Sequence, residues 1–299
     1  MVLGRDLQQT YNINEVPYGA EFLAKNTDPT NGKPLSDNFF RPYPGYGTIT
    51  YTANTFSSNY HALLVSLNRR FAKGVHLGVN YAFAKYMDFS SGNSALPLYE
   101  PLRQWSYGLD GADQTHNMTV NFTYNVPGAS KLMPNRIVRY ALDNWVLSGI
   151  AQFATGQPAA MSFTTTDGTN EVGGGDGQRM DVCGNAYSGN IHTFYQWFNT
   201  AAFCRPGMND PGNAGKYDVR NPGVNNWDAA LSKNFPLKND KRYFEFRWEA
   251  YNAFNHTQYS TLNTAARFTP AGAQSNALFG EVTATRTPRV MQGSLRFTF

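Results

Sequence analysis

The sequence predicts an all-β fold, an antiparallel transmembrane β-barrel of the outer-membrane type. Apolar and polar residues alternate with a period of two along many segments, as strands between two environments require. No segment approaches the roughly 18 consecutive apolar residues of a membrane-spanning helix. Short and long connections follow one another in turn, which is typical of such barrels. Together these observations favour strands over helices throughout the chain.

The composition leaves two broad classes open, a soluble secreted β-rich protein and a membrane barrel. The 299 residues are 41% hydrophobic, 15% aromatic and 15% charged, and the charged share lies well below the usual value of about a quarter. The net charge is +4 and no run of five basic residues occurs, so we expect no nucleic-acid partner. An apolar set that alternates with polar residues, without long runs, suits a membrane barrel.

The segment Thr115–Val126 gives the clearest strand signal. Its two faces separate completely at a period of two, whereas a helix would mix them. One face holds His116, Met118, Val120, Phe122, Tyr124 and Val126, and the other holds Asn117, Thr119, Asn121, Thr123 and Asn125.

The same alternation predicts about eight or nine strands in all, many of them near the length that crosses a bilayer at a tilt. The stronger segments are 63–71, 75–83, 227–235, 244–254 and 293–299, and the weaker ones are 46–56, 144–155 and 159–165. In 144–155 the faces are ambiguous, because Val146 and Ile150 oppose Trp145, Leu147 and Phe153.

The connections support a membrane orientation. Short connections are expected at 72–74 and 236–241, an intermediate one at 127–143, and long ones at 86–114, 157–225 and 257–288. If the chain ends on the periplasmic side, every long connection falls outside the cell, as in known barrels. The N-terminal segment has no signal peptide, because Arg5 and Asp6 interrupt it. We therefore expect the true N-terminus to lie upstream, since the alternative is a cytoplasmic protein.

The two strand faces differ in a way that indicates lipid on one side and water on the other. The polar face is rich in Asn, Thr, Ser and Gly, which suits a hydrated lumen. Aromatic residues near strand ends are expected to form interfacial girdles: Tyr60, Tyr81, Tyr124, Trp145, Trp227 and Phe299. Lys233 falls on the outward face, where its amine is expected to reach the headgroups. Asn252 is expected to face outward near the other rim.

Several motifs, taken in order, resemble a known family. They are YHALLVSLNRRFAKGVHLGVNYAFAK (60–85), WFNTAAF (197–203), GNAGKYDVRNPGVNNWDAALSKNF (212–235), FEFRWEAYNAFNHTQY (244–259) and SLRFTF (294–299). They resemble the barrel end of Oar-like TonB-dependent receptors, the type with a carboxypeptidase-regulatory-like domain. The resemblance covers nearly the whole chain from about Asn12.

This resemblance implies that residues 1–299 are the C-terminal portion of a 22-stranded barrel. The plug, the TonB-contacting segment and the regulatory-like domain of that family match nothing in the chain. Contact with TonB is therefore expected only through the missing plug. The final residues Leu295, Phe297 and Phe299 resemble the terminal signal that the barrel-assembly machinery reads, so this machinery is an expected partner.

No catalytic set emerges, so neither enzymatic activity nor a cofactor is expected. The five histidines are dispersed along the chain, and no metalloprotease, nucleophile-elbow, P-loop or CxxC motif occurs. A charge ladder along the lumen is the expected role of Asp228, Glu245, Arg247, Glu249 and Arg296. Glu245 and Glu249 would lie about 13 Å apart on one strand, too far for a paired acid and base.

The Asp/Gly-rich stretch DGTNEVGGGDGQRMD offers a weak calcium candidate in Asp167, Asp176 and Asp181. It lacks the EF-hand spacing, and a flexible external loop is the preferred interpretation. Cys183 and Cys204 flank part of the same loop and are expected to form a disulfide. On the chain-entropy description such a bond contributes about 3 kcal/mol.

Three functional hypotheses remain at this point. The first is a fragment of a TonB-dependent receptor, embedded in outer-membrane lipid, whose external loops and lumen bind an unidentified ligand. The second is a small stand-alone outer-membrane barrel or adhesin, since about eight strands are enough to close a narrow barrel. The third is a soluble secreted β-protein with binding or hydrolase activity in its loops.

Overall fold

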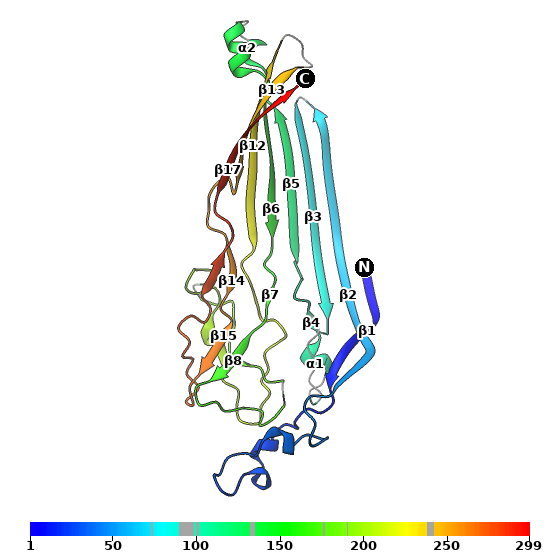
Figure 1. The fold of residues 1–299 in the computed structure, drawn as a ribbon, viewed down its shortest axis with the longest axis vertical. Helices are drawn as coiled ribbons and strands as arrows, with labels where there is room; N and C mark the ends of the chain where they lie inside the picture. The colour runs from blue at the N-terminus through cyan, green and yellow to red at the C-terminus, as the bar shows by residue number, and fades with distance from the viewer. Residues whose placement is uncertain are drawn as a thin grey trace.

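The computed structural model describes residues 1–72, 74–89, 99, 102–131, 135–175, 177–189, 191–237 and 242–299. Its main feature is one long, curved antiparallel sheet (Figure 1). The strands along the sheet are β1 (Val2–Asn12), β2 (Thr50–Ala72), β3 (Val75–Asp88), β5 (His116–Asn125), β6 (Trp145–Ala154), β12 (Val224–Pro236), β13 (Tyr243–Tyr251) and β17 (Val290–Thr298), with β4 (Gly108–Leu109) paired to β3.

The remaining elements are short and lie in the connections. The strands are β7 (Pro158–Ala159), β8 (Ser162–Thr165), β9 (Asp181–Val182), β10 (Phe203–Cys204), β11 (Val219–Arg220), β14 (Tyr259–Leu262), β15 (Ala265–Phe268) and β16 (Val282–Thr285). The helices are α1 (Leu102–Ser106) and α2 (Arg136–Leu142), with 3-10 turns η1 (Ala20–Phe22), η2 (Ala24–Asn26), η3 (Asp37–Phe39), η4 (Ala129–Lys131) and η5 (Thr200–Ala202). In the part of the chain that is described, neither helix is long and apolar enough to cross a bilayer.

Most predicted strands are confirmed, but three boundaries were wrong. The segments 46–56 and 63–71 belong to one strand, β2, which runs without a break for 23 residues. The weak segment 159–165 does not join the large sheet, because β7 pairs with β11 and β8 pairs in parallel with β15. The segment 244–254 ends early, since β13 stops at Tyr251.

Strand β1 was not predicted at all. Its pairing with β2 shifts register between Gly4 and Leu7, and Asp6 there has a φ of 54°. A bulge of this kind moves successive side chains off the regular alternation and hides the period of two. The polar residues at this bulge, Arg5 and Asp6, are therefore compatible with a strand.

The register assigns each residue of the sheet to one of two faces. A continuous apolar row crosses five neighbouring strands through Val75, Tyr124, Leu147, Leu231 and Trp248. One step along each strand, a polar row runs through Thr123, Ser148, Ala230, Glu249 and Gln292. The two faces thus differ across the whole sheet, as a wall between lipid and water requires.

The register also resolves strand β6 and corrects one aromatic residue. Leu147 pairs with Leu231 on the apolar face, so the neighbouring Val146 and the exposed Ile150 lie on the polar face. Tyr60 was expected in an outward girdle, but it shares the polar face with Ser66, because β2 pairs with β3 without irregularity from Asn59 to Arg69. Its ring meets that of Tyr86 at 6.1 Å.

Long and short connections lie at opposite ends of the sheet. Figure 1 places β7, β8, β14, β15, α1 and the turns after β1 at one end. The link between β2 and β3, helix α2 and the C-terminus lie at the other end. The expected grouping of the long connections at one end is therefore confirmed, and the 37-residue connection from 13 to 49 joins the same group.

Candidate functional site

The described parts of the four long connections, 13–49, 86–114, 156–223 and 252–289, fold together into a body that we call the cap. The connections between 156 and 223 and between 252 and 289 share one hydrophobic core. Phe198 is fully buried and meets Phe203 and Phe279 edge to face at 5.7 and 5.3 Å. Such aromatic contacts, together with the buried area, stabilise a compact structure. The cap is therefore a folded unit.

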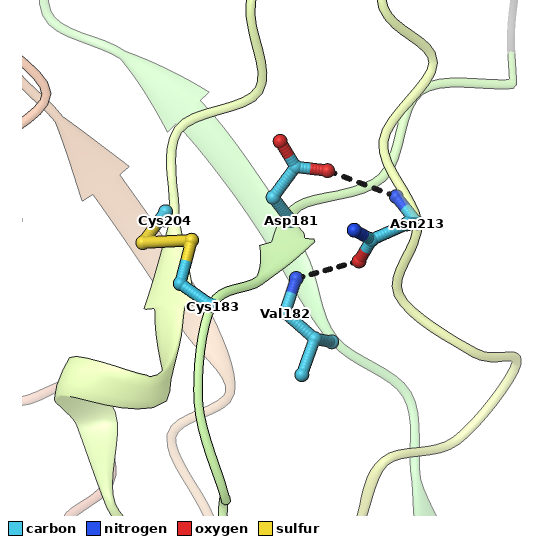
Figure 2. Close-up of a disulfide and its surroundings, with 5 residues drawn as sticks. All are labelled: Asp181, Val182, Cys183, Cys204 and Asn213. Carbon is cyan, nitrogen blue, oxygen red and sulfur yellow. Dashed lines mark hydrogen bonds between the residues drawn. A yellow bond between two sulfur atoms is a disulfide. The ribbon is translucent and has the colours of Figure 1, made fainter.

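A disulfide closes one side of the cap. Cys183 and Cys204 are bonded, with their Cα atoms 6.0 Å apart, beside the two-stranded pair β9–β10. Figure 2 shows how the neighbouring backbone is held: Val182 N donates to Asn213 Oδ1 at 2.7 Å, and Asn213 N donates to Asp181 Oδ1 at 3.1 Å. The disulfide thus fixes β9 against β10, and the two hydrogen bonds tie β9 to the segment around Asn213.

The calcium candidates do not form a metal site among the described residues. Asp181 accepts the Asn213 hydrogen bond, Asp167 binds Arg205, and Asp176 lies outside the residues that the structure describes. In the described ranges no group of three or more side chains has the arrangement of metal ligands. The stretch around them is packed instead, since Glu171 and Val172 are at most 1% exposed.

Arg205 joins the 156–223 connection to the 252–289 connection. Its Nε donates to the buried carboxylate of Glu171, its Nη2 lies 3.2 Å from Asp167 Oδ2, and its Nη1 donates to the Thr269 carbonyl at 2.7 Å. Burial raises the pKa of Asp167, but hydrogen bonds from Thr169 and Arg205 outweigh this and lower it to about 2. The aspartate therefore stays ionised beside the guanidinium at all physiological pH values.

Three further basic residues tie the 156–223 connection to the 86–114 connection. Arg220 Nη2 lies 2.6 Å from the fully buried Asp113 Oδ2, and Lys216 Nζ pairs with Asp88. Arg179 lies over the Trp105 ring, 4.2 Å from its centroid, and donates to the Trp105 carbonyl at 2.7 Å. These contacts join two connections that are far apart in the sequence, 86–114 and 156–223, into one body.

A run of three glycines packs the 156–223 connection of the cap against its 13–49 connection. Gly173, Gly174 and Gly175 all have positive φ values, of 59°, 125° and 77°. A Cβ atom on Gly174 would lie 2.5 Å from Val16 Cγ1, and one on Gly175 would lie 2.4 Å from the Tyr18 ring. Only glycine allows both this backbone and this close approach.

A polar cavity of about 830 Å³ lies where the polar face of the sheet meets the cap. Asp228 Oδ1 accepts from Asn226 Nδ2 at 2.8 Å, and Asn226 Oδ1 accepts from the buried Gln258 Nε2 at 2.9 Å. Asn252 N also donates to Asp228 Oδ1, at 2.9 Å. The size suits a small ligand, and the amide-rich wall suits one that is recognised by hydrogen bonds.

The residues of the predicted charge ladder lie on the neighbouring strands β12, β13 and β17. Glu245 stands opposite Arg296 in the register, and Arg247 Nε lies 2.7 Å from Glu249 Oε1 on the polar face. Asp228 has a different set of partners, the amides of the cavity. Four of the five residues thus lie on β13 and β17, and Asp228 lies on the adjacent strand β12, where it lines one pocket together with Arg247 and Glu249.

Two polar residues differ from the expectation, Asn252 in its face and Lys233 in its burial. Asn252 has a φ of 49° directly after β13 ends, and it lines the cavity instead of facing outward. Lys233 lies on the apolar face, but it is 2% exposed and its amine donates to the Asp143 carbonyl. Its charge lies near the rings of Trp145 and Phe235, at 5.4 and 5.1 Å, so the amine is held by the protein.

The C-terminal residues continue the apolar face. Leu295 pairs with Phe246, and Phe297 pairs with Phe244, their rings 4.9 Å apart. Phe299 follows β17 and is 91% exposed. These side chains form an outward surface at the end of the sheet opposite the cap.

Sequence reasoning missed the basic residues that assemble the cap. Each one is a lone Arg or Lys in a stretch rich in Gly, Asn and Pro: Arg179, Arg205, Lys216 and Arg220. The sequence offered no signal for them, since a single Arg or Lys in a connection is most often exposed. The acidic partners of Lys216 and Arg220 lie on the 86–114 connection, those of Arg205 lie 34 and 38 residues upstream of it, and no local pattern points to them.

The comparisons with known proteins concern nearly the whole chain. A family model described as an outer membrane beta barrel domain matches residues 2–292. No curated protein and no solved structure matches the chain. The two-faced sheet and the family match agree on the same type of protein.

Proposed function

Because this chain belongs to the outer membrane beta barrel domain family and is located in the cell outer membrane, we propose that it forms part of the wall of a TonB-dependent receptor. In this proposal the apolar face contacts lipid and the polar face lines the lumen. The cap faces the cell exterior, since outer-membrane barrels have long external loops and short periplasmic turns. The order of motifs that resembles Oar-like receptors supports the receptor role.

The observation that carries the proposal is the pair of edges of the sheet. Within the described residues β1 pairs only with β2, and β17 pairs only with β13. An unpaired edge in lipid leaves backbone groups without hydrogen bonds, each at a cost of several kcal/mol. In this proposal further strands of a larger barrel pair with both edges in the membrane.

The cap and the cavity give this wall segment a role in ligand binding. Ion pairs join 156–223 to 86–114, a shared hydrophobic core joins it to 252–289, and backbone hydrogen bonds join it to 13–49, which makes a packed surface beside a polar cavity. A rigid site loses little conformational entropy when it binds. We propose that the external ligand contacts this surface, and that the chain itself carries no catalytic group.

The partners follow from the same proposal. Lipid contacts the apolar face, and the barrel-assembly machinery reads the outward surface formed by Leu295, Phe297 and Phe299. TonB is reached only through a plug contributed by other residues of the receptor. Energy for transport would enter through that plug, and the segment described here would contribute the wall and the ligand-facing surface.

Two measurements on intact cells test the receptor role. An antibody against residues 157–225 should detect, in detergent-extracted outer membranes, a polypeptide far larger than the 33.3 kDa of this chain. The same polypeptide should cross-link to TonB in living cells after formaldehyde treatment. A band at the mass of this chain would overturn the larger barrel and favour a small stand-alone barrel. A large polypeptide that never cross-links to TonB would overturn the receptor role.

A further inference from the structure

The connection between β5 and β6 carries helix α2 at the end of the sheet opposite the cap (Figure 1). The side chain of Asn135 caps its start by accepting from Ile137 N at 2.9 Å. Three apolar side chains of this helix are exposed to a degree that is costly in water: Ile137 at 77%, Tyr140 at 56% and Leu142 at 51%. A connection at this end needs only a tight turn, so the helix requires another explanation.

Contacts hold α2 firmly against the rim of the sheet. Trp145 Nε1 donates to the Ala141 carbonyl at 2.9 Å, and the buried Lys233 amine donates to the Asp143 carbonyl. Trp145 and Lys233 are a registered pair on the apolar face of the sheet. The last turn of α2 is therefore attached to the side of the sheet that contacts lipid.

The exposed apolar residues of α2 are thus continuous with the lipid-facing surface. Trp145 begins the apolar face of β6, and Leu147 and Leu231 follow it toward the membrane centre. An indole at the start of this face marks the interface between headgroups and hydrocarbon. Helix α2 comes directly before that indole, at the depth of the headgroups.

The charged residues of α2 lie beside two of its exposed apolar residues. At about 100° per residue, Ile137 and Tyr140 lie about 60° apart, Arg136 and Arg139 follow beside them about 60° apart, and Leu142 lies beyond the arginines. Both arginines are exposed. The nearby Asp143 carboxylate is held by Ser130, whose backbone N donates to it at 3.0 Å. Asp143 also attracts Arg139, but within the described residues neither arginine forms an ion pair, and both exposed guanidinium groups can contact anions outside the protein.

We propose that α2 is an interfacial helix that binds the phospholipid leaflet of the outer membrane. Ile137 and Tyr140 enter the boundary between headgroups and acyl chains, and the adjacent Arg136 and Arg139 contact lipid phosphates. The occupant is a phospholipid surface, because the apolar face of the sheet continues into the helix and the helix carries only positive charge. The choice of leaflet rests on the orientation given above, with the cap outside.

Depth-dependent fluorescence quenching tests this assignment on the full chain. Single cysteines replace Ile137, Phe246 on the apolar face and Tyr195 in the cap, and each is labelled with nitrobenzoxadiazole. The native cysteines are bonded to each other and do not react. The chain is inserted into vesicles of phosphatidylethanolamine and phosphatidylglycerol that contain brominated lipid. Quenching of the Phe246→Cys label shows that the chain has inserted, and the quenching at the other two positions is then compared with it.

The label at Ile137→Cys should show about half of the quenching seen at Phe246→Cys, because interfacial helices lie about 5–10 Å into the boundary. The Tyr195→Cys label, at a site that is 78% exposed in the cap, should show almost none. Equal quenching at 137 and 195 would overturn the proposal. The experiment uses no TonB, so a failure of the receptor role leaves its result unchanged.

A charge reversal tests the phosphate contacts. In Arg136→Glu/Arg139→Glu the quenching at 137 should fall at least about twofold, since two favourable contacts with anionic lipid become repulsive. The matched control is Arg267→Glu/Arg286→Glu, which makes the same change in charge at two exposed arginines of the cap, and it should leave the quenching unaltered. Unaltered quenching in the α2 variant would overturn the phosphate contacts.

Discussion

Arg220 Nη2 lies 2.6 Å from Asp113 Oδ2, and this contact joins two connections that are 107 residues apart in the sequence. The Asp113 side chain is fully buried and also accepts from Tyr86 N at 2.8 Å. A buried carboxylate of this kind depends on its cation, because its hydration has been lost. The position of the 86–114 connection beside the 156–223 connection therefore depends in part on this guanidinium group.

We predict that Arg220→Met destabilises the cap by about 3–5 kcal/mol, because it leaves the Asp113 carboxylate buried and unpaired. The measurement is the urea midpoint of the chain in detergent, followed by protease resistance of the cap. The control Arg286→Met removes an exposed arginine of the same region and should change stability by less than about 0.5 kcal/mol. Equal effects of the two variants would contradict the prediction.

Removal of the disulfide should weaken the cap without disturbing the sheet. The bond joins residues that are 21 positions apart, and a closed loop of this size contributes about 3 kcal/mol on the chain-entropy description. Cys183→Ser/Cys204→Ser should therefore become sensitive to protease within 157–225, while the fragment that contains β12 and β13 stays resistant. Equal resistance of the oxidised chain and the double variant would show that the cap core alone is sufficient.

The glycine run offers a matched pair of substitutions. Gly174→Ala places a methyl group 2.5 Å from Val16 Cγ1 and 2.8 Å from the Pro17 carbonyl, at a φ of 125°. Gly168→Ala has a φ of 71° with nothing within 4 Å, so it carries only the cost of the left-handed backbone, about 1–2 kcal/mol. We expect Gly174→Ala to expose Val16 and the turn after it to protease, and Gly168→Ala to have a distinctly smaller effect.

The pair of Lys216 and Asp88 predicts a dependence on pH. Asp88 lies in the cap, beyond the last pair of β3 with β5 at Phe83. Burial raises the pKa of Asp88 from 3.8 to about 6, although Lys216 lowers it. The folded chain therefore binds this proton more tightly than the unfolded chain, and the contribution of Asp88 to stability falls as the pH rises from about 4 to about 6.

Lys216→Met should raise the pKa of Asp88 further, because the compensating cation is lost. The substitution then costs little near pH 4, where the carboxyl is protonated, and about 1–2 kcal/mol more near pH 8. Urea midpoints at the two pH values measure the difference. Lys25→Met, at an exposed lysine, is the control and should show the same small loss at both. A loss for Lys216→Met that does not vary with pH would disprove the role of Asp88.

Much of the sheet was predictable because its two faces contact different environments. The alternation at 115–126 placed strand β5 to within one residue of its observed ends. Where both faces carry apolar residues, as in β6 with Ile150 and Leu147, the period alone left the faces undecided. There the register with β12 decides, since each strand inherits its orientation from its neighbour.

Local breaks in the backbone account for the strand errors. Strand β1 was missed because a bulge around Asp6 interrupts its alternation. Asn252 was assigned to the wrong side because its own left-handed backbone ends β13, so the alternation does not continue through it. Both are single-residue changes in φ that a period of two does not detect.

The sequence by itself determined that the chain forms strands with one apolar face, and that its long connections gather at one end. These properties depend on residues that are close in the chain, where pattern and backbone geometry are linked directly. The tertiary structure decided that the long connections fold into a cap, that Arg205, Lys216 and Arg220 find their carboxylates there, and that Lys233 is buried. These pairings join segments far apart in the sequence, and their energies arise only when the burial of both partners removes water from the charges.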